Sequence, residues 1–186
     1  MGTIMTDQPD RNYSVLNDVM QAMHSQVQYA EAKNAALLAV NFAIVVGIAT
    51  LFTSDGTLPS QLQLSLMMCA VTIGGGGLLS LASFLPVMSS RTKVTRPSTD
   101  QNLFFWGSIA RMSPPDYAEK MLGALGSSLS AGRLDLDLAN QIVVNARVAR
   151  RKFRVFYVAT IVTVLGFAAP ILVLTGFFFT QGMELR

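Results

Sequence analysis

The chain has 186 residues, of which 51% are hydrophobic and only 13% are charged. Soluble domains usually carry about 25% charged residues, so this composition indicates a membrane protein. A single cysteine, Cys69, excludes a disulfide framework within the chain. A single histidine, His24, also excludes the usual zinc sites and paired catalytic groups. We therefore expect no metal, no cofactor and no enzymatic activity.

Residues 1–34 are predicted to form a cytoplasmic amphipathic helix. Its apolar side chains recur every three or four positions, which is the spacing of one helix face, at Leu16, Val19, Met20, Met23, Val27 and Ala30. Neither Gly nor Pro occurs between Tyr13 and Gly47, so this helix is expected to run unbroken into the membrane. The apolar face favours packing against another helix, with binding flat on lipid as the alternative. No cleavable signal peptide is expected, because this mixed-charge segment precedes the first apolar run.

Three uncharged apolar runs, at 35–53, 62–88 and 155–180, are each predicted to cross the membrane as a helix. Residues 35–88 therefore hold the first two transmembrane helices. The first run has close to the ~20 residues that a helix needs to cross a ~30 Å hydrocarbon core. Four glycines and a proline weaken the second run as a continuous helix, so its continuity stays open. Three buried helices of a soluble bundle are disfavoured, because soluble helices carry a polar stripe that these runs lack.

Basic residues flank these runs on one side of the membrane. They follow the second run at Arg91, Lys93 and Arg96 and precede the third at Arg147, Arg150, Arg151, Lys152 and Arg154. The loop at 54–61 holds neither lysine nor arginine. By the positive-inside rule, both basic flanks and the N-terminus lie in the cytoplasm, and the tail at 181–186 lies on the far side.

Residues 89–154 are predicted to form a helical cap in the cytoplasm. The motif SPPD at 113–116 combines a favoured capping serine, prolines in the first turn and an aspartate at the positive end of the helix dipole. The helix that begins there is expected to end near Gly132.

A second cap helix is expected to begin within 134–137 and to continue through the basic cluster into the third run. Its predicted inner face carries Leu134, Leu138, Ile142, Asn145 and Val148. The aromatic cluster at 103–106 is expected to anchor the cap at the membrane interface or to enter its core.

Three patches resemble the Pycsar transmembrane effector family, PycTM. They are YAEAKNAALLAVN at 29–41, NLFFWGSIARMSPPDYAEKM at 102–121 and QIVVNARVARRKFRVF at 141–156. The residues that carry the resemblance are Lys33, Asn41, Trp106, Tyr117 and the basic run near Lys152. The family pattern has an acidic residue where Glu31 stands and often another where Ser108 stands, so this chain matches the first and lacks the second.

The resemblance implies an antiphage effector of the bacterial inner membrane, with a periplasmic tail at 181–186. Such an effector stays silent until a partner cyclase makes cyclic UMP or cyclic CMP after infection. It then impairs the membrane, and the infected cell stops growing, which is abortive infection. The implied partners are the cyclic pyrimidine mononucleotide and membrane lipid, with no nucleic acid polymer.

A cyclic nucleotide carries one negative charge and an aromatic base, so its receptor needs a cation or helix N-terminus and polar or stacking groups. The cytoplasmic cations of the right type are Arg111, Arg133, Arg147 and Arg151. Trp106 and Tyr117 are candidates for stacking on the base. The alternatives are topology control and headgroup contact for the cluster at 147–154, and an interface or core position for Trp106. A segment of this length without strands has no room for a conventional cyclic-nucleotide-binding β-roll, so any site must be helical and shared between subunits.

Polar residues and glycines in the membrane runs are candidates for a membrane path or for coupling. Lys33 lies at the entrance of the first run and Asn41 two turns deeper on a similar face. Both residues could line a route that opens on activation. In the simpler interpretation, Lys33 snorkels to the membrane surface and Asn41 forms an interhelical hydrogen bond. The glycines Gly74, Gly75, Gly76 and Gly77 allow either close helix packing or a hinge.

We therefore predict an all-α integral membrane protein with three transmembrane helices and a cytoplasmic helical cap. It is expected to be a homo-oligomer, because three helices are too few to enclose a wide pore. The rival interpretation is an oligomeric membrane anchor or scaffold without triggered activity. A small membrane enzyme is disfavoured, because no paired carboxylates, metal ligands or activated nucleophile share one plausible site.

Overall fold

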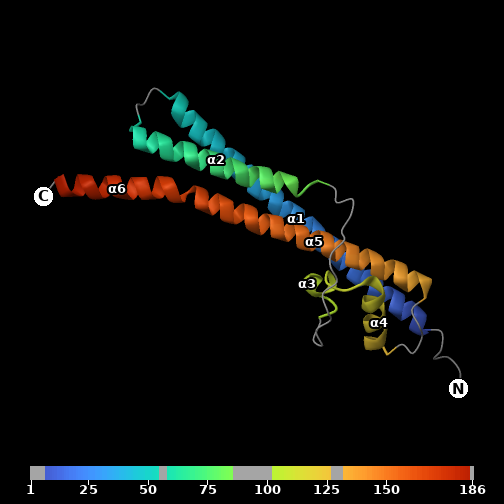
Figure 1. The fold of residues 1–186 in the computed structure, drawn as a ribbon. Helices are drawn as coiled ribbons and strands as arrows, with labels where there is room; N and C mark the ends of the chain where they lie inside the picture. Colours follow the sequence, from blue (N-terminus) through green and yellow to red (C-terminus); the bar gives the residue numbers. More distant parts are fainter. Residues whose placement is uncertain (1–6, 55–57, 86–101, 127–131, 185–186) are drawn as a thin grey trace, which may run out of the picture. The chain divides into compact units, whose positions relative to one another are not determined.

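The computed structural model describes residues 7–54, 58–85, 102–126 and 132–184. Within these ranges the fold is all-α without a strand, as predicted (Figure 1). The helices are α1 (Asp7–Thr53), α2 (Ser60–Ala82), α3 (Trp106–Ile109), α4 (Pro114–Ala124), α5 (Arg133–Gly166) and α6 (Ala168–Glu184). The basic residues predicted to follow the second run, Arg91, Lys93 and Arg96, lie outside the described residues.

The chain divides into two compact units. The cap unit comprises residues 1–30 and 86–153, and the membrane unit comprises residues 31–85 and 154–186. Helices α1 and α5 each contribute residues to both units.

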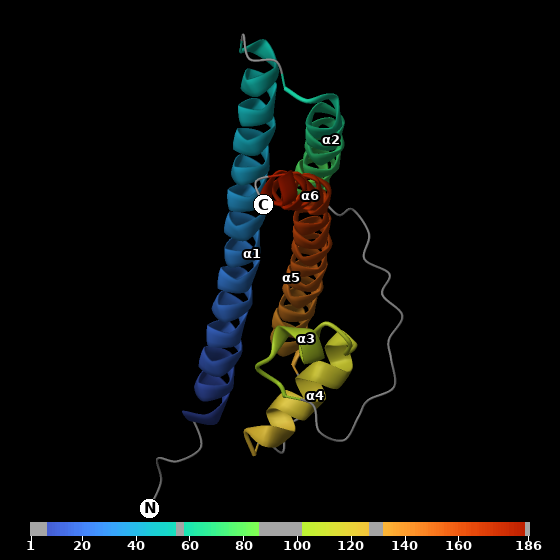
Figure 2. The ribbon, with the colours of Figure 1, turned by 90° about the vertical axis from the view of Figure 1, so that its left-hand side faces the viewer.

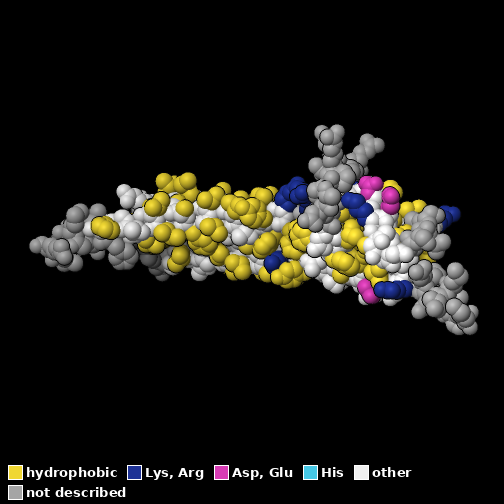
Figure 3. Space-filling model, turned by 90° about the horizontal axis from the view of Figure 1, so that it is seen from below, with side chains coloured by type: hydrophobic (Ala, Val, Ile, Leu, Met, Phe, Trp, Pro, Cys, Tyr) yellow, Lys and Arg dark blue, Asp and Glu magenta, His cyan; other side chains and the backbone are white. Residues whose placement is uncertain are grey.

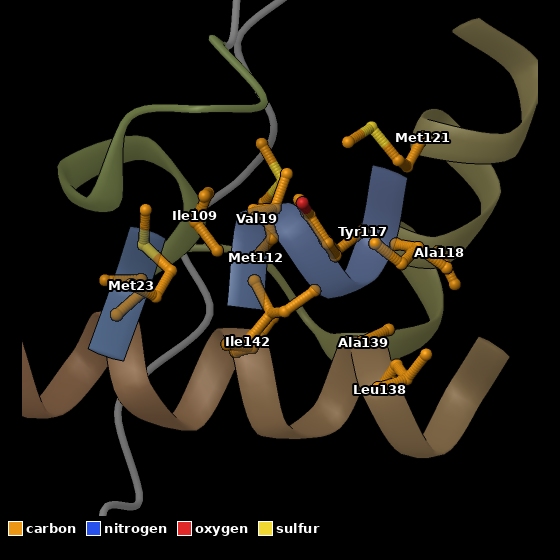
Figure 4. Packing of buried hydrophobic residues seen from close by; sticks show 14 residues of the cluster. Val19, Met23, Ile109, Met112, Tyr117, Ala118, Met121, Leu138, Ala139 and Ile142 are labelled. Carbon is orange, nitrogen blue, oxygen red and sulfur yellow. The ribbon is translucent and has the colours of Figure 1, made fainter. Parts of the chain in front are cut away.

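Helix α1 is one unbroken helix, as the absence of Gly and Pro predicts (Figure 2). Four residues of its predicted apolar face are buried, namely Leu16, Val19, Met23 and Ala30, and the other two are half-buried. The face packs in the cap core against residues of α3, α4 and α5, which confirms the interpretation of helix packing (Figure 4).

Helix α4 begins as the sequence predicts but ends earlier. The Oγ of Ser113 accepts a hydrogen bond from the backbone N–H of Asp116, at 3.3 Å, and prolines occupy the first turn. The helix ends at Ala124, so the expected end near Gly132 is wrong. Gly126 has φ +73°, a left-handed conformation that terminates helices and that glycine adopts without steric cost.

Helix α5 begins at Arg133, just before the predicted range. The carboxylate of Asp135 accepts a hydrogen bond from the backbone N–H of Gly132, at 3.0 Å, which caps the first turn. On its predicted inner face, Leu138 and Ile142 are buried, but Leu134 is 61% exposed. The inner face is instead completed by Ala139, Val143, Ala146 and Ala149. These small side chains let neighbouring elements approach α5 closely.

The third apolar run forms two helices instead of one. Helix α5 ends at Gly166, Phe167 lies in a turn and α6 begins at Ala168. Pro170 lacks the N–H that would bond to the carbonyl of Gly166, and its ring would clash with that carbonyl, so the helix breaks there. Residues 155–166 are too few to cross a ~30 Å core alone, so the third crossing also uses α6.

Among the described residues, three helical stretches are long and apolar enough to cross a membrane, namely Arg11–Thr53, Ser60–Ala82 and Arg133–Gly176. The outer surface of the membrane unit is strongly apolar, and hydrophobic side chains cover much of it in Figure 3. Val71 and Phe42 are 77% and 69% exposed. A surface of this kind is stable in lipid and unfavourable in water.

Candidate functional site

The segment at 102–113 is fastened to α5 at two places. Trp106 stacks on Phe153 of α5, with ring centroids 5.0 Å apart and planes inclined by 20°. Farther toward the start of α5, Arg147 donates from Nη2 to the carbonyl of Met112 at 2.9 Å and from Nε to that of Ala110 at 3.4 Å. These contacts hold the end of α3 and the start of α4, which carries Tyr117, against α5.

Tyr117 lies in the core of the cap unit. Its side chain is fully buried, and its hydroxyl donates to the backbone carbonyl of Leu103 at 3.3 Å. Figure 4 shows it among Val19, Met112 and Ala118. Burial raises the pKa of this phenol, because the charged form would lose its hydration. The ring therefore offers no exposed face on which a base could stack.

The predicted ligand residues thus divide into two groups. Trp106, Arg147 and Tyr117 make contacts within the cap unit, whereas Arg111 and Arg151 are exposed. Arg133, the further cation, is exposed in the first turn of α5. Phe104 and Phe105 are exposed by 63% and 49%, so only part of the aromatic cluster enters the core.

A shallow groove lined mainly by polar residue types, called the α1–α5 groove, lies between α1 and α5 of the cap unit, with a volume of about 500 Å³. It is lined by Met20, Gln21, His24 and Ser25 of α1 and by Gln141 and Asn145 of α5. His24 is held by its neighbour Gln28, whose Nε2 lies 3.1 Å from the Nε2 of the imidazole. The sequence reasoning missed this groove. The signal that could have found it is a cluster of polar residues at helical spacing beside each apolar face.

Asn41 and Thr163 join α1 to α5 inside the membrane unit. The Asn41 Nδ2 donates to Thr163 Oγ1 at 3.0 Å. The Thr163 hydroxyl in turn lies 3.1 Å from Asn41 Oδ1 and 2.9 Å from the carbonyl of Ala159, and can donate to either. Both side chains are buried. This is the interhelical hydrogen bond that the simpler interpretation of Asn41 predicted.

Gly76 lets α2 approach this pair. A Cβ atom on Gly76 would lie 2.8 Å from Thr163 Oγ1, which is too close, and 3.2 Å from Asn41 Nδ2, which is a tight contact. A Cβ on Gly77 would make ordinary contacts, whereas Gly74 and Gly75 have nothing within 4 Å of that position. Helix α2 runs unbroken through all four glycines. Gly76, Asn41 and Thr163 together form the polar junction of the membrane unit.

Two further features of the membrane unit lie on either side of Asn41 along α1. Lys33 places its Nζ 5.5 Å from the centroid of the Phe156 ring, a cation–π contact between α1 and α5. About two turns along α1 from Asn41, the interior becomes an apolar cluster of Ile48, Cys69 and Ile73. The interior of the membrane unit is therefore polar around Asn41 and Thr163 and apolar around Ile48.

These observations define a class of protein, an all-helical membrane protein with a helical cap. Among the described residues, no group of three or more His, Cys, Asp or Glu side chains could hold a metal ion.

Residues 15–179 match PycTM, the Pycsar effector protein domain, and the chain belongs to this family. The family is one of antiphage defence effectors and not a known class of enzyme. The chain is also 30% identical to the Pycsar effector protein RsPycTM of a Rhizobium species over 145 residues. That similarity covers 74% of this chain and 82% of the relative. No solved structure matches the chain.

Proposed function

We propose that this protein is the membrane effector of a Pycsar antiphage system. It binds cyclic UMP or cyclic CMP made by a partner cyclase during infection and then impairs the bacterial inner membrane, which causes abortive infection. The observation that carries the proposal is the family match over 165 of 186 residues, from 15 to 179, on a chain with three stretches able to cross a membrane.

The topology in this proposal follows the basic residues. The cap unit and the N-terminus face the cytoplasm, where a cyclase would release its product, and the tail at 181–186 is periplasmic. A homo-oligomer supplies the helices that a single subunit lacks for a wide opening.

Coupling in this proposal runs along α1 and α5, because each helix contributes to both units. A ligand that binds the cap more tightly in one arrangement of these helices shifts the equilibrium toward that arrangement. The polar junction holds α1, α2 and α5 together, so a change in α1 and α5 acts on it directly. Opening the junction would expose Lys33 and Asn41 to a path through the membrane unit.

Co-expression with a uridylate or cytidylate cyclase tests the proposal. Growth and membrane potential are followed in bacteria that carry the effector with an active cyclase or with a catalytically inactive one. We expect growth arrest and depolarisation only with an active cyclase. Healthy, polarised cells in both cultures would support the rival function, a membrane anchor or scaffold without triggered activity.

A further inference from the structure

We infer that the cyclic nucleotide binds in the α1–α5 groove of the cap unit, where side-chain amides form hydrogen bonds with its base. This inference rests on the proposed function and gives it a binding site. The groove volume of about 500 Å³ lies within the ~300–1,000 Å³ typical of small-molecule sites.

The lining suits the edge of a pyrimidine base. Uracil and cytosine each present a mixed row of donors and acceptors, and a carboxamide offers one acceptor and two donors in a plane. Gln21 on α1 and Gln141 and Asn145 on α5 supply three such groups. Met20 adds a thioether, which makes favourable contacts with aromatic rings.

The described lining holds no lysine or arginine, so in this groove the cyclic phosphate binds through uncharged donors and not through the cation expected from the sequence. Ser25 and His24 supply a hydroxyl and an imidazole in the same lining, and both groups can donate to phosphate oxygens. The cations Arg147 and Lys152 are less suited to this role. Arg147 already donates to two backbone carbonyls, and Lys152 is buried.

The position of the groove makes it an effective place for a trigger. Its lining residues, within the part of the chain that the structure describes, belong to α1 and α5, the two helices that contribute to both units. A ligand that bonds to both helices at once is bound most tightly in one spacing of the pair, and this difference in affinity is what shifts an equilibrium.

The test is a binding measurement on the full chain in lipid nanodiscs with cyclic UMP, CMP, AMP and GMP. Gln141→Glu is nearly isosteric, removes the amide donors and adds a charge that repels the phosphate. We expect it to weaken binding of the preferred pyrimidine nucleotide about tenfold or more, and Gln21→Ala to weaken it about two- to tenfold. The matched control is Asn140→Asp, which adds the same charge at the next, exposed position of α5, outside the lining.

Each result decides the inference. Weaker binding in both groove variants with an unchanged control supports it. If the wild type binds a cyclic nucleotide and the groove variants bind equally well, or the control weakens as much as Gln141→Glu, the groove is not the site and the proposed function stands. If the wild type binds none of the four nucleotides, the groove is not their site. If, in addition, an active cyclase causes no growth arrest, the proposed function fails as well. Unchanged thermal midpoints of the variants, followed through Trp106 fluorescence, establish that they are folded.

Discussion

The cap unit and the membrane unit are built on opposite rules. The cap buries an apolar core, in which Leu16, Ile142 and Tyr117 are fully enclosed. The membrane unit exposes large apolar side chains and buries the polar pair Asn41 and Thr163 against Gly76. In water, burial of apolar surface drives packing, whereas in lipid close contact between small residues and interhelical hydrogen bonds must do so. One chain therefore contains two interiors that should respond differently to the same kind of substitution.

The largest effect is expected in the cap core. Ile142→Ala removes a fully buried side chain and should lower the free energy of unfolding by about 2–5 kcal/mol. Val144→Ala, at a position 42% exposed on the same helix, should cost less than about 0.5 kcal/mol. Trp106 is the single tryptophan and lies in the cap unit, so its fluorescence during denaturant unfolding in detergent measures this difference. Equal costs would mean that the cap is not stabilised by its apolar core.

The next largest effect is expected at the hydrogen bonds that Arg147 donates to the two carbonyls just after α3. Arg147→Met retains most of the aliphatic stem but leaves the carbonyls of Met112 and Ala110 without the guanidinium. Hydrogen bonds to charged groups contribute about 1.5–3 kcal/mol, so cap stability should fall by about that amount. The control Arg151→Met removes an exposed arginine one turn later and should change little. A loss of nucleotide binding without a loss of stability in Arg147→Met would instead assign this arginine to the ligand.

The cap-core test removes a buried side chain, whereas the test in the membrane unit adds a side chain at a closely packed glycine. Gly76→Val places a side chain against Thr163 and Asn41 and should cost about 1–3 kcal/mol through overpacking. Gly75→Val makes the same substitution next to it, where nothing lies within 4 Å, and should cost much less. Thermal unfolding in detergent, followed by circular dichroism, compares the two variants. Similar thermal midpoints would contradict close packing of α2 at the polar junction.

Tyr117→Phe is a smaller test of the cap, with a pH dependence. The variant loses the hydrogen bond to Leu103, about 0.5–1.5 kcal/mol. Because burial raises the pKa of the Tyr117 phenol above its ordinary value of 10.0, the neutral form is favoured in the folded state. The resulting stability is fully present below the unfolded pKa and is lost as the pH rises above it toward the folded pKa. Wild-type stability should therefore fall above about pH 10 more steeply than that of Tyr117→Phe, measured by denaturant titration.

The smallest effect is expected at the hydrogen bond of the polar junction. Thr163→Val keeps the shape of the side chain and removes the hydroxyl that contacts Asn41, and interhelical hydrogen bonds in membranes average about 0.6 kcal/mol. Thr160→Val is the control, because that hydroxyl donates only within its own helix, to Phe156. Partial opening by Thr163→Val should lower the cyclase activity needed for growth arrest. If both variants respond like the wild type, the junction is not part of the trigger.

Local signals predicted local structure well in both units. The capping serine at 113, the unbroken α1 and the apolar periodicity of residues 16–30 each depend on neighbours within about one turn, and the structure confirms them. The end of α4 and the break near Phe167 were missed. Both depend on single residues, Gly126 and Pro170, whose effect on the backbone is strong but leaves the surrounding pattern of apolar residues unchanged.

Composition and the distribution of apolar residues along the chain were enough to establish an all-helical protein with three membrane-spanning stretches, because lipid leaves an isolated segment little alternative to a helix. Residue types alone also identified the arginines and aromatic residues as possible ligand groups. Only the tertiary structure decided that Arg147 clamps two carbonyls, that Tyr117 is buried, that Gly76 and not Gly74 meets Asn41, and that polar side chains of α1 and α5 line a common groove. These assignments depend on which helix faces meet, because the periodicity of one helix marks a face of that helix but does not say which face of another helix it contacts.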